Sequence, residues 1–169
     1  MNLDYLPRYR LAQLPTPVEK LERLTRALGG PELWIKRDDQ TGLALGGNKT
    51  RKLEFLVGQA LTQGADTLVT VGGAQSNHCR QTAAAAAKAG LQCELILNGQ
   101  QPAVPNGNLL LNEILGAKAH WIERSVYAGR AFGALVDQIR RGVFKPGETV
   151  LFWHTRGAPA LFAYAADFI

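Results

Sequence analysis

The 169-residue sequence lacks several features that would place it in a specialised class. No apolar run approaches the roughly 18 residues that a membrane-spanning helix needs. There are only two cysteines, Cys79 and Cys93, without a CxxC pair and without metal-type spacing to the three histidines. We therefore predict reduced thiols in or near the core and no metal site. The N-terminus carries Asp4 and several early prolines instead of an apolar signal core, so we expect a cytoplasmic protein.

The sequence also has no long run of charges of the same sign. The net charge is +5, but the longest purely basic run is Arg140-Arg141, and no basic stripe alternates with aromatic residues. This pattern excludes an obvious nucleic-acid partner and supports at most a preference for small anions. With 46% apolar and 20% charged residues, the composition is typical of one globular domain or two small ones.

The stretch Gly46-Gly47-Asn48-Lys49 leads directly into an amphipathic pattern. Apolar residues recur at helical spacing at Leu53, Leu56, Val57, Ala60 and Leu61. Lys49 is therefore expected in or just before the first turn of a helix. The positive end of the helix dipole, with Arg51 and Lys52 nearby, disfavours another positive charge and leaves more of the free amine that condenses with carbonyls. The alternative is an ordinary solvated lysine at a helix start.

The N-terminal third predicts a helix and a short strand. Thr16-Pro17-Val18-Glu19 has the pattern of a capping box with proline at the first helical position, and Gly29-Gly30 follows an apolar helical face. We therefore predict a helix from 17 to about 28. The segment Leu33-Trp34-Ile35-Lys36-Arg37 predicts a short strand, and Asp38-Asp39 opens a loop that leads to Lys49.

A rhythm of 26 residues follows. The junctions Gly64-Ala65, Gly90-Leu91 and Gly116-Ala117 are each 26 residues apart, and each separates a helical pattern from a short apolar run. The apolar runs are 67–71, 93–97 and 119–122. Glycine at a helix end followed by a strand is typical of βαβ units, which form a parallel sheet with right-handed crossovers.

Two turns could face a ligand at this sheet. Gly72 to His78 follows the first strand and opens an alanine-rich helix, a geometry that aims backbone N–H groups at an anion; the alternative is a turn needed only for tight packing. Asn106 or Asn108 could cap the next helix. Later segments predict a helix at 127–141, a strand at 149–153, a second ligand-facing turn at 154–159 and a helix at 160–168.

Three segments together are similar to one enzyme family. IKRDDQTGLALGGNKTRKLEFL, GGAQSNHCRQTAAAAAKAG and VLFWHTRGAPALFAYA resemble the D-cysteine desulfhydrase and 1-aminocyclopropane-1-carboxylate (ACC) deaminase family. The resemblance implies a pyridoxal-phosphate (PLP) enzyme with an α/β fold, three layers around a parallel sheet. This is the tryptophan-synthase-β type, fold type II. It also implies a small amino-acid substrate and a homodimer without nucleic-acid or membrane partners.

The resemblance also implies roles for individual residues. Lys49 corresponds to the lysine that binds PLP as a Schiff base and removes the substrate α-proton. Ser76 corresponds to the polar group beside the reacting carbon. Asn77 corresponds to a contact of the cofactor 3-oxygen or the substrate carboxylate, with Asn48 beside the lysine and His78 closing the loop. Thr155 resembles the residue that faces the pyridine nitrogen, where a neutral hydroxyl suits elimination.

The sequence also departs from the family pattern in its length, since family members are about twice as long. Residues up to about Ser125 resemble its start, and those from Val126 resemble its last stretch, so the middle half is missing. We therefore expect a small domain at 46–125, with 1–45 and 126–169 as remnants of the large PLP-binding domain. The missing part carries the loop that cradles the PLP phosphate, and Arg156 replaces a glycine of the HTGG turn.

The functional hypotheses follow from this comparison. The first is PLP-dependent conversion of D-cysteine to pyruvate, hydrogen sulfide and ammonia, with ACC deamination as its close variant. The second is an inactive, internally deleted fragment that acts as a binding or association module. A nucleotide-binding P-loop is excluded because Asn48 separates Gly47 from Lys49. A serine hydrolase is disfavoured because Ser76 and His78 are only two residues apart and G-x-S-x-G is not present.

Overall fold

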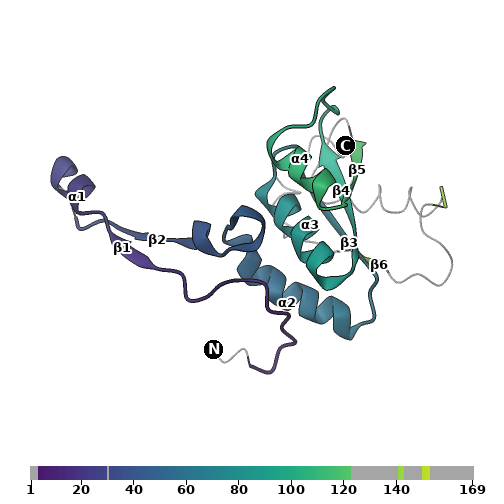
Figure 1. Cartoon of the computed structure of the whole chain (residues 1–169), viewed down its shortest axis with the longest axis horizontal. Helices are drawn as coiled ribbons and strands as arrows, with labels where there is room; N and C mark the ends of the chain where they lie inside the picture. Colours follow the sequence, from purple (N-terminus) through teal and green to yellow (C-terminus); the bar gives the residue numbers. More distant parts are fainter. Residues whose placement is uncertain (1–3, 30, 123–140, 143–149, 153–169) are drawn as a thin grey trace, which may run out of the picture.

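The computed structural model of the protein describes residues 4–29, 31–122, 141–142 and 150–152 (Figure 1). The helices predicted at 127–141 and 160–168, and the turn at 154–159 that contains Thr155, lie outside these residues. Within the described part of the chain, no helix is long and apolar enough to cross a membrane.

A four-stranded parallel sheet forms the centre of the molecule. Its strands are β3 (Thr67–Gly73), β4 (Gln92–Asn98), β5 (Lys118–Ile122) and β6 (Val150–Phe152). They lie in the order β5-β4-β3-β6, and every adjacent pair is parallel. The strands predicted from the 26-residue rhythm are confirmed, as is the α/β class with a parallel sheet.

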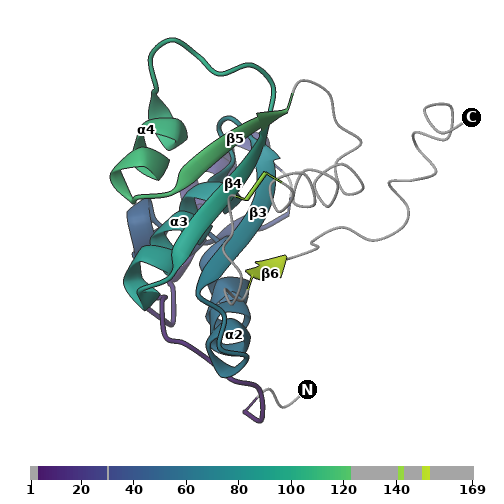
Figure 2. The same ribbon diagram turned by 90° about the vertical axis from the view of Figure 1, so that its right-hand side faces the viewer.

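Three helices pack on this sheet. They are α2 (Lys49–Thr62), α3 (Asn77–Ala89) and α4 (Gly107–Ile114). The crossovers from β3 to β4 and from β4 to β5 run in the same direction, so right-handed connections place α3 and α4 on one face, as Figure 2 shows. The alanines at 83–86 are all buried, and their small side chains let α3 lie close to the fully buried Leu95 and Leu97 of β4.

The helix predicted from position 17 is wrong at its start. Residues Val18–Lys20 form strand β1, which pairs antiparallel with β2 (Trp34–Lys36), and helix α1 begins only at Glu22 and ends at Leu28. The Thr16 hydroxyl donates to the Asp38 carboxylate at 2.7 Å, so it does not cap a helix. The predicted end of the helix is confirmed, because Gly29 is left-handed (φ 62°). In Figure 1 these elements form an arm that projects away from the sheet and its helices.

The strand predicted near 149–153 is present as β6, and it pairs with β3 through Thr67↔Val150 and Val69↔Phe152. A short piece of the C-terminal segment therefore extends the sheet of the predicted 46–125 unit. The division of the chain into a small domain and two remnants of a larger one stays a prediction.

Candidate functional site

The turn before α2 requires both of its glycines. Gly46 has φ 71°, and a Cβ there would lie 1.8 Å from the Asp39 carbonyl oxygen. At Gly47 a Cβ would lie 2.3 Å from Nε2 of Gln81. These distances are far shorter than any van der Waals contact. A side chain at position 46 would displace backbone, and one at position 47 would displace the Gln81 side chain and strain a φ of 131°. The glycine pair therefore lets the chain pass closely between the preceding loop and α3.

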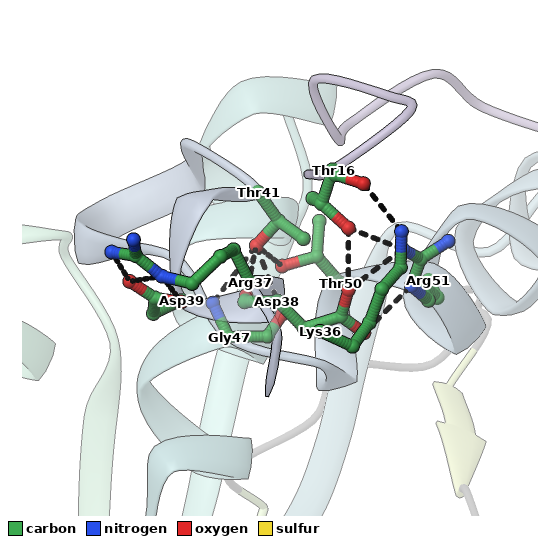
Figure 3. Close-up of polar contacts among 9 residues, drawn as sticks. All are labelled: Thr16, Lys36, Arg37, Asp38, Asp39, Thr41, Gly47, Thr50 and Arg51. Atoms are coloured by element: carbon green, nitrogen blue, oxygen red, sulfur yellow. Dashed lines mark hydrogen bonds and ion pairs between the residues drawn. The ribbon is translucent and has the colours of Figure 1, made fainter. Parts of the chain in front are cut away.

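Hydrogen bonds from the preceding loop hold this turn in place (Figure 3). The Gly47 N–H donates to the Asp38 carbonyl at 2.9 Å and to the Thr41 hydroxyl at 2.8 Å. The Asp38 carboxylate accepts from the Arg51 guanidinium at 2.7 and 2.8 Å and from Thr16. The Arg51 hydrogen bonds, followed by the Thr16 hydroxyl, hold the pKa of Asp38 well below its usual range. The loop is thus ionically fixed at neutral pH.

Lys49 is the first residue of α2, as predicted, and it is half-buried. The N-cap residue Asn48 makes no side-chain hydrogen bond to the helix. Gln81 of α3 instead accepts both the N–H and the hydroxyl of Thr50, each at 2.8 Å. The Arg80 guanidinium donates to the Gly46 carbonyl at 2.8 Å. Consecutive residues of α3 therefore hold the chain on both sides of Lys49.

Two lysines and a histidine form an electrostatic cluster at this end of α2. Lys49 and Lys52 are three residues apart and lie on neighbouring positions of one helix surface. Burial, and then the charge of Lys49, lowers the pKa of Lys52. Burial, followed by the charges of Lys52 and Lys49, lowers the pKa of His78 to about 4. His78 is therefore neutral at pH 7 beside two amines.

His78 belongs to the first turn of α3, not to a free loop. Its Nε2 lies 3.1 Å from the Thr70 hydroxyl of β3, and its buried Nδ1 has no hydrogen-bond partner among the described residues. A small, largely apolar pocket opens here between α2, β3 and α3. It is lined by Leu53, Leu56, Val57, Leu68, Val69, Thr70, His78 and Thr82.

The turn after β3 is built from Ser76 and its neighbours. The Ser76 hydroxyl caps α3 by accepting the Cys79 N–H at 3.3 Å. The side-chain oxygen Oδ1 of Asn77 accepts from the Asn108 side-chain amide at 2.9 Å, and Gln75 bonds to both Asn106 and Asn108. The turn is therefore tied to the start of α4. Apart from the Cys79 N–H, the N–H groups of the first turn of α3 lie at the N-terminal end of that helix, where an anion could accept from them.

The structure brings together most of the predicted site residues. Lys49 interacts electrostatically with His78, and Ser76 and Asn77 immediately precede His78 at the same end of α3. Asn48 lies exposed at the start of α2. Thr155 lies outside the described residues. The catalytic and binding roles of these side chains stay predictions.

Sequence reasoning missed the residues that support the site. Gln81, Thr41 and Thr50 are all fully buried polar residues, and Lys52 adds a second amine. The available signal was the position of Thr50 and Gln81, which are polar residues next to apolar or alanine residues in helices predicted to pack on the sheet.

These residues fit a cofactor that carries an aldehyde and an anionic group. Lys49 offers an amine at a helix start, and Lys52 offers a cation within one turn. The buried, unpartnered Nδ1 of His78 leaves a polar atom available beside them. The cysteines are no part of this chemistry: Cys79 and Cys93 are both buried and free, as predicted, and burial raises the pKa of Cys79 to about 11.

Comparisons with known proteins point in one direction. The family model described as "Pyridoxal-phosphate dependent enzyme" matches residues 9–139. A 1-aminocyclopropane-1-carboxylate deaminase of Burkholderia orbicola is 45% identical over 155 residues, which cover 86% of this chain and 46% of that protein. A D-cysteine desulfhydrase of Klebsiella pneumoniae is 45% identical over 150 residues, covering 86% of this chain and 45% of that protein.

A solved structure gives the same result. The crystal structure of an ACC deaminase homologue superimposes with a TM-score of 0.76 at 37% identity, covering 89% of this chain and 45% of that chain. This chain thus spans about half the length of the curated relatives it matches.

Proposed function

We propose that this chain, which belongs to the pyridoxal-phosphate dependent enzyme family, provides the cofactor lysine and the substrate-facing turn of an enzyme that acts on a small amino acid. The observation that supports this proposal is the position of Lys49. It begins α2 behind a turn that tolerates no side chain, and it lies beside a neutral His78 at the end of α3 that carries Ser76.

The reaction we propose is the elimination and deamination of D-cysteine, in which D-cysteine and water give pyruvate, hydrogen sulfide and ammonia. The desulfhydrase relative supports this substrate, and the deaminase relatives support ACC equally well. Among the site residues described above, none distinguishes the two. Product analysis with each substrate therefore decides between them.

PLP, when bound, supplies an aldehyde that holds the substrate amine and a ring that withdraws electrons from the α-carbon. Lys49 would bind the cofactor through its Nζ and accept the α-proton on the same atom. Lys52 would supply a cation for the cofactor phosphate, because a dianion would relieve the repulsion between the charges of Lys49 and Lys52. The neutral His78 adds no third positive charge to this cluster.

The turn at 76–78 would hold the substrate. Ser76 is the N-cap and Asn77 the first residue of α3, and the N–H groups at a helix start favour a carboxylate through hydrogen bonding and the helix dipole. Ser76 accepts a hydrogen bond from Cys79, so its own hydroxyl proton can still be donated to the substrate. We retain Thr155 as the proposed partner of the pyridine nitrogen.

Borohydride reduction in the presence of PLP tests this proposal. We expect one covalent adduct at Lys49, and Lys49→Ala should abolish it. The matched control is Lys88→Ala, because Lys88 is an exposed lysine at the far end of α3. Adducts spread evenly over several lysines would contradict a formed site. Pyruvate and sulfide release from D-cysteine, or deamination of ACC, then identifies the substrate.

A second candidate function is that of an association module, and the exposed arm favours it. Leu28 is 67% exposed, Val18 58% and Trp34 57%. Val18 and Trp34 lie on one face of the antiparallel β1–β2 pair, and Ile35 lies on the other. Two short strands with apolar residues on both faces are not stable alone, so the arm fits against a further polypeptide.

Sedimentation velocity separates these possibilities. The homodimer that we predicted, or a complex with a longer relative, should be weakened by Trp34→Lys and not by Lys118→Ala, which changes an exposed residue on the edge strand β5. A monomer at all concentrations, with or without a longer relative, would contradict the association function.

A further inference from the structure

We infer that Gln81 is a positioning residue for Lys49, because it provides from α3 the N-terminal cap that α2 does not make for itself. This inference rests on the proposed function of Lys49, but its structural part can be tested without cofactor.

The start of α2 has no side-chain cap of its own. The first N–H groups of any α-helix have no partner within the helix, and an N-cap side chain usually accepts one of them. Asn48, at the N-cap, makes no such bond. The Thr50 N–H donates to Oε1 of Gln81 at 2.8 Å and, over a longer distance, to the Gly47 carbonyl at 3.3 Å. The Thr50 hydroxyl donates to the same Gln81 oxygen at 2.8 Å. One carbonyl oxygen therefore holds the backbone and the side chain of the residue after Lys49.

On the other side of Lys49, the buried Thr41 hydroxyl holds the chain. The Thr41 hydroxyl accepts the Gly47 N–H at 2.8 Å and lies 3.5 Å from the Thr50 hydroxyl. Thr41, Thr50 and Gln81 are each 0% exposed. The chain around Lys49 is thus enclosed by a short hydrogen-bonded series that water does not reach, and Gln81 is the member that connects it to α3.

The Gln81 side chain also explains why residue 47 is a glycine. Nε2 of Gln81 has no hydrogen-bond partner among the described residues, and it occupies the space where a Cβ of residue 47 would lie, at 2.3 Å. The side-chain oxygen Oε1 therefore accepts both hydrogen bonds of Gln81, while the NH₂ group makes none and only fills space. Replacing that amide nitrogen by oxygen removes no hydrogen bond, whereas replacing the carbonyl oxygen removes two.

Two neighbouring amines, those of Lys49 and Lys52, could react with the cofactor aldehyde. Lys49 and Lys52 lie three residues apart on α2, and the charges of both lower the pKa of His78. A fixed first turn presents Lys49 in one position. When the cap is lost, the first turn frays and Lys49 should lose its advantage over Lys52.

The first experiment measures amide hydrogen exchange on the cofactor-free chain. In the native protein the Thr50 N–H should exchange at least about tenfold more slowly than the Lys49 N–H, the ratio expected of one ordinary hydrogen bond. Gln81→Leu should remove most of this difference, because only the longer bond of Thr50 to the Gly47 carbonyl remains. Gln81→Glu, which keeps the acceptor oxygen, should preserve it. The control is Asn112→Leu, which removes an equally buried amide from α4 and should leave Thr50 unchanged.

The second experiment uses PLP and borohydride and compares the adduct at Lys49 with that at Lys52 by peptide mass spectrometry. We expect adduct mainly at Lys49 in the native chain, in Gln81→Glu and in Asn112→Leu, and a mixture of both lysines in Gln81→Leu. Rapid exchange of Thr50 in the native chain would overturn the inference. Slow exchange of Thr50 without any adduct at Lys49 would instead overturn the proposed function.

A poorly folded Gln81→Leu chain does not remove the test. The exchange of the native Thr50 amide still decides whether the cap exists. If Gln81→Glu gave the mixture of Lys49 and Lys52 adducts that is expected of Gln81→Leu, the role of the Gln81 oxygen would be refuted.

Discussion

Glu54 is the residue whose replacement we expect to cost the most stability. It lies on α2, is 0% exposed, and holds the N-terminal segment onto the helix. Its carboxylate accepts the N–H groups of Leu11 and Ala12, each at 2.9 Å, and pairs with the Arg8 guanidinium. All of its partners lie 42 to 46 residues away in sequence, so this one side chain closes a long loop.

The magnitude follows from what each substitution leaves unpaired. Glu54→Leu is of similar size but removes every acceptor, so two enclosed N–H groups lose their partner at about 1–3 kcal/mol each. With the loss of the Arg8 pair we expect about 3–5 kcal/mol. Glu54→Gln keeps one acceptor oxygen and loses the charge, so we expect about 1–2 kcal/mol. Since small domains are stable by only about 5–15 kcal/mol, the Leu variant should be near its unfolding threshold at 25 °C.

The charge of Glu54 also predicts a pH dependence. Burial alone would raise the pKa of Glu54, but the N–H groups of Ala12 and Leu11 and the Arg8 side chain together lower it below its ordinary value. Because the pKa is lower in the folded state, the unfolded chain binds the proton more readily. The stabilisation is therefore complete above the ordinary pKa of 4.5 and is lost as the pH falls through the folded value.

Urea unfolding followed by circular dichroism measures these changes. The control is Glu113→Gln, which changes an exposed glutamate on α4 and should shift the free energy of unfolding by less than about 0.5 kcal/mol. A Glu54→Leu chain within about 1 kcal/mol of the native one would refute the reasoning, since it would mean that water replaces the carboxylate at no cost.

Three further predictions concern other buried positions. Gly58→Ala should lower the free energy of unfolding by about 1–3 kcal/mol in the same urea assay, because its Cβ would lie 2.5 Å from the Pro7 carbonyl oxygen. His78 should titrate near pH 4 by NMR, and because its folded pKa is below its ordinary value of 6.5, stability should fall as the pH drops from 6.5 to 4, an effect absent in His78→Phe. Cys79 and Cys93 should not react with a thiol reagent at pH 8 in the folded chain, since burial raises the pKa of both, and should react fully in urea.

The sequence predicts the parallel sheet well because its signals are local and agree with one another. Gly64, Gly90 and Gly116 are all left-handed in the structure, with φ between 68° and 77°, and each ends a helix before the next strand. A glycine that terminates a helix, followed by an apolar run, needs no information from distant residues. The same applies to Lys49, whose position follows from the glycine pair before it and the apolar repeat after it.

The capping-box prediction failed because a distant partner outweighed a local pattern. Thr16 and Glu19 have the spacing of a helix start, yet Glu19 pairs with Arg37 and Thr16 bonds to Asp38. The β1–β2 pairing also satisfies backbone groups that one turn of helix would leave exposed. Short polar patterns carry little energy, so contacts with residues about twenty positions away decide the local structure.

The buried polar residues of α2 explain how an amphipathic helix becomes a precise support. An apolar stripe at least about 100° wide fixes the rotation of a helix only loosely, because several neighbouring rotations bury nearly the same area. Thr50, Glu54 and Gly58 follow one another at four-residue intervals along one side of α2, where they meet Gln81, the N–H groups of Leu11 and Ala12, and the Pro7 carbonyl. Directional bonds of 2.8–2.9 Å allow far less rotation than apolar contact does. The apolar residues therefore attach α2 to the sheet, and the polar stripe determines which way Lys49 and Lys52 point.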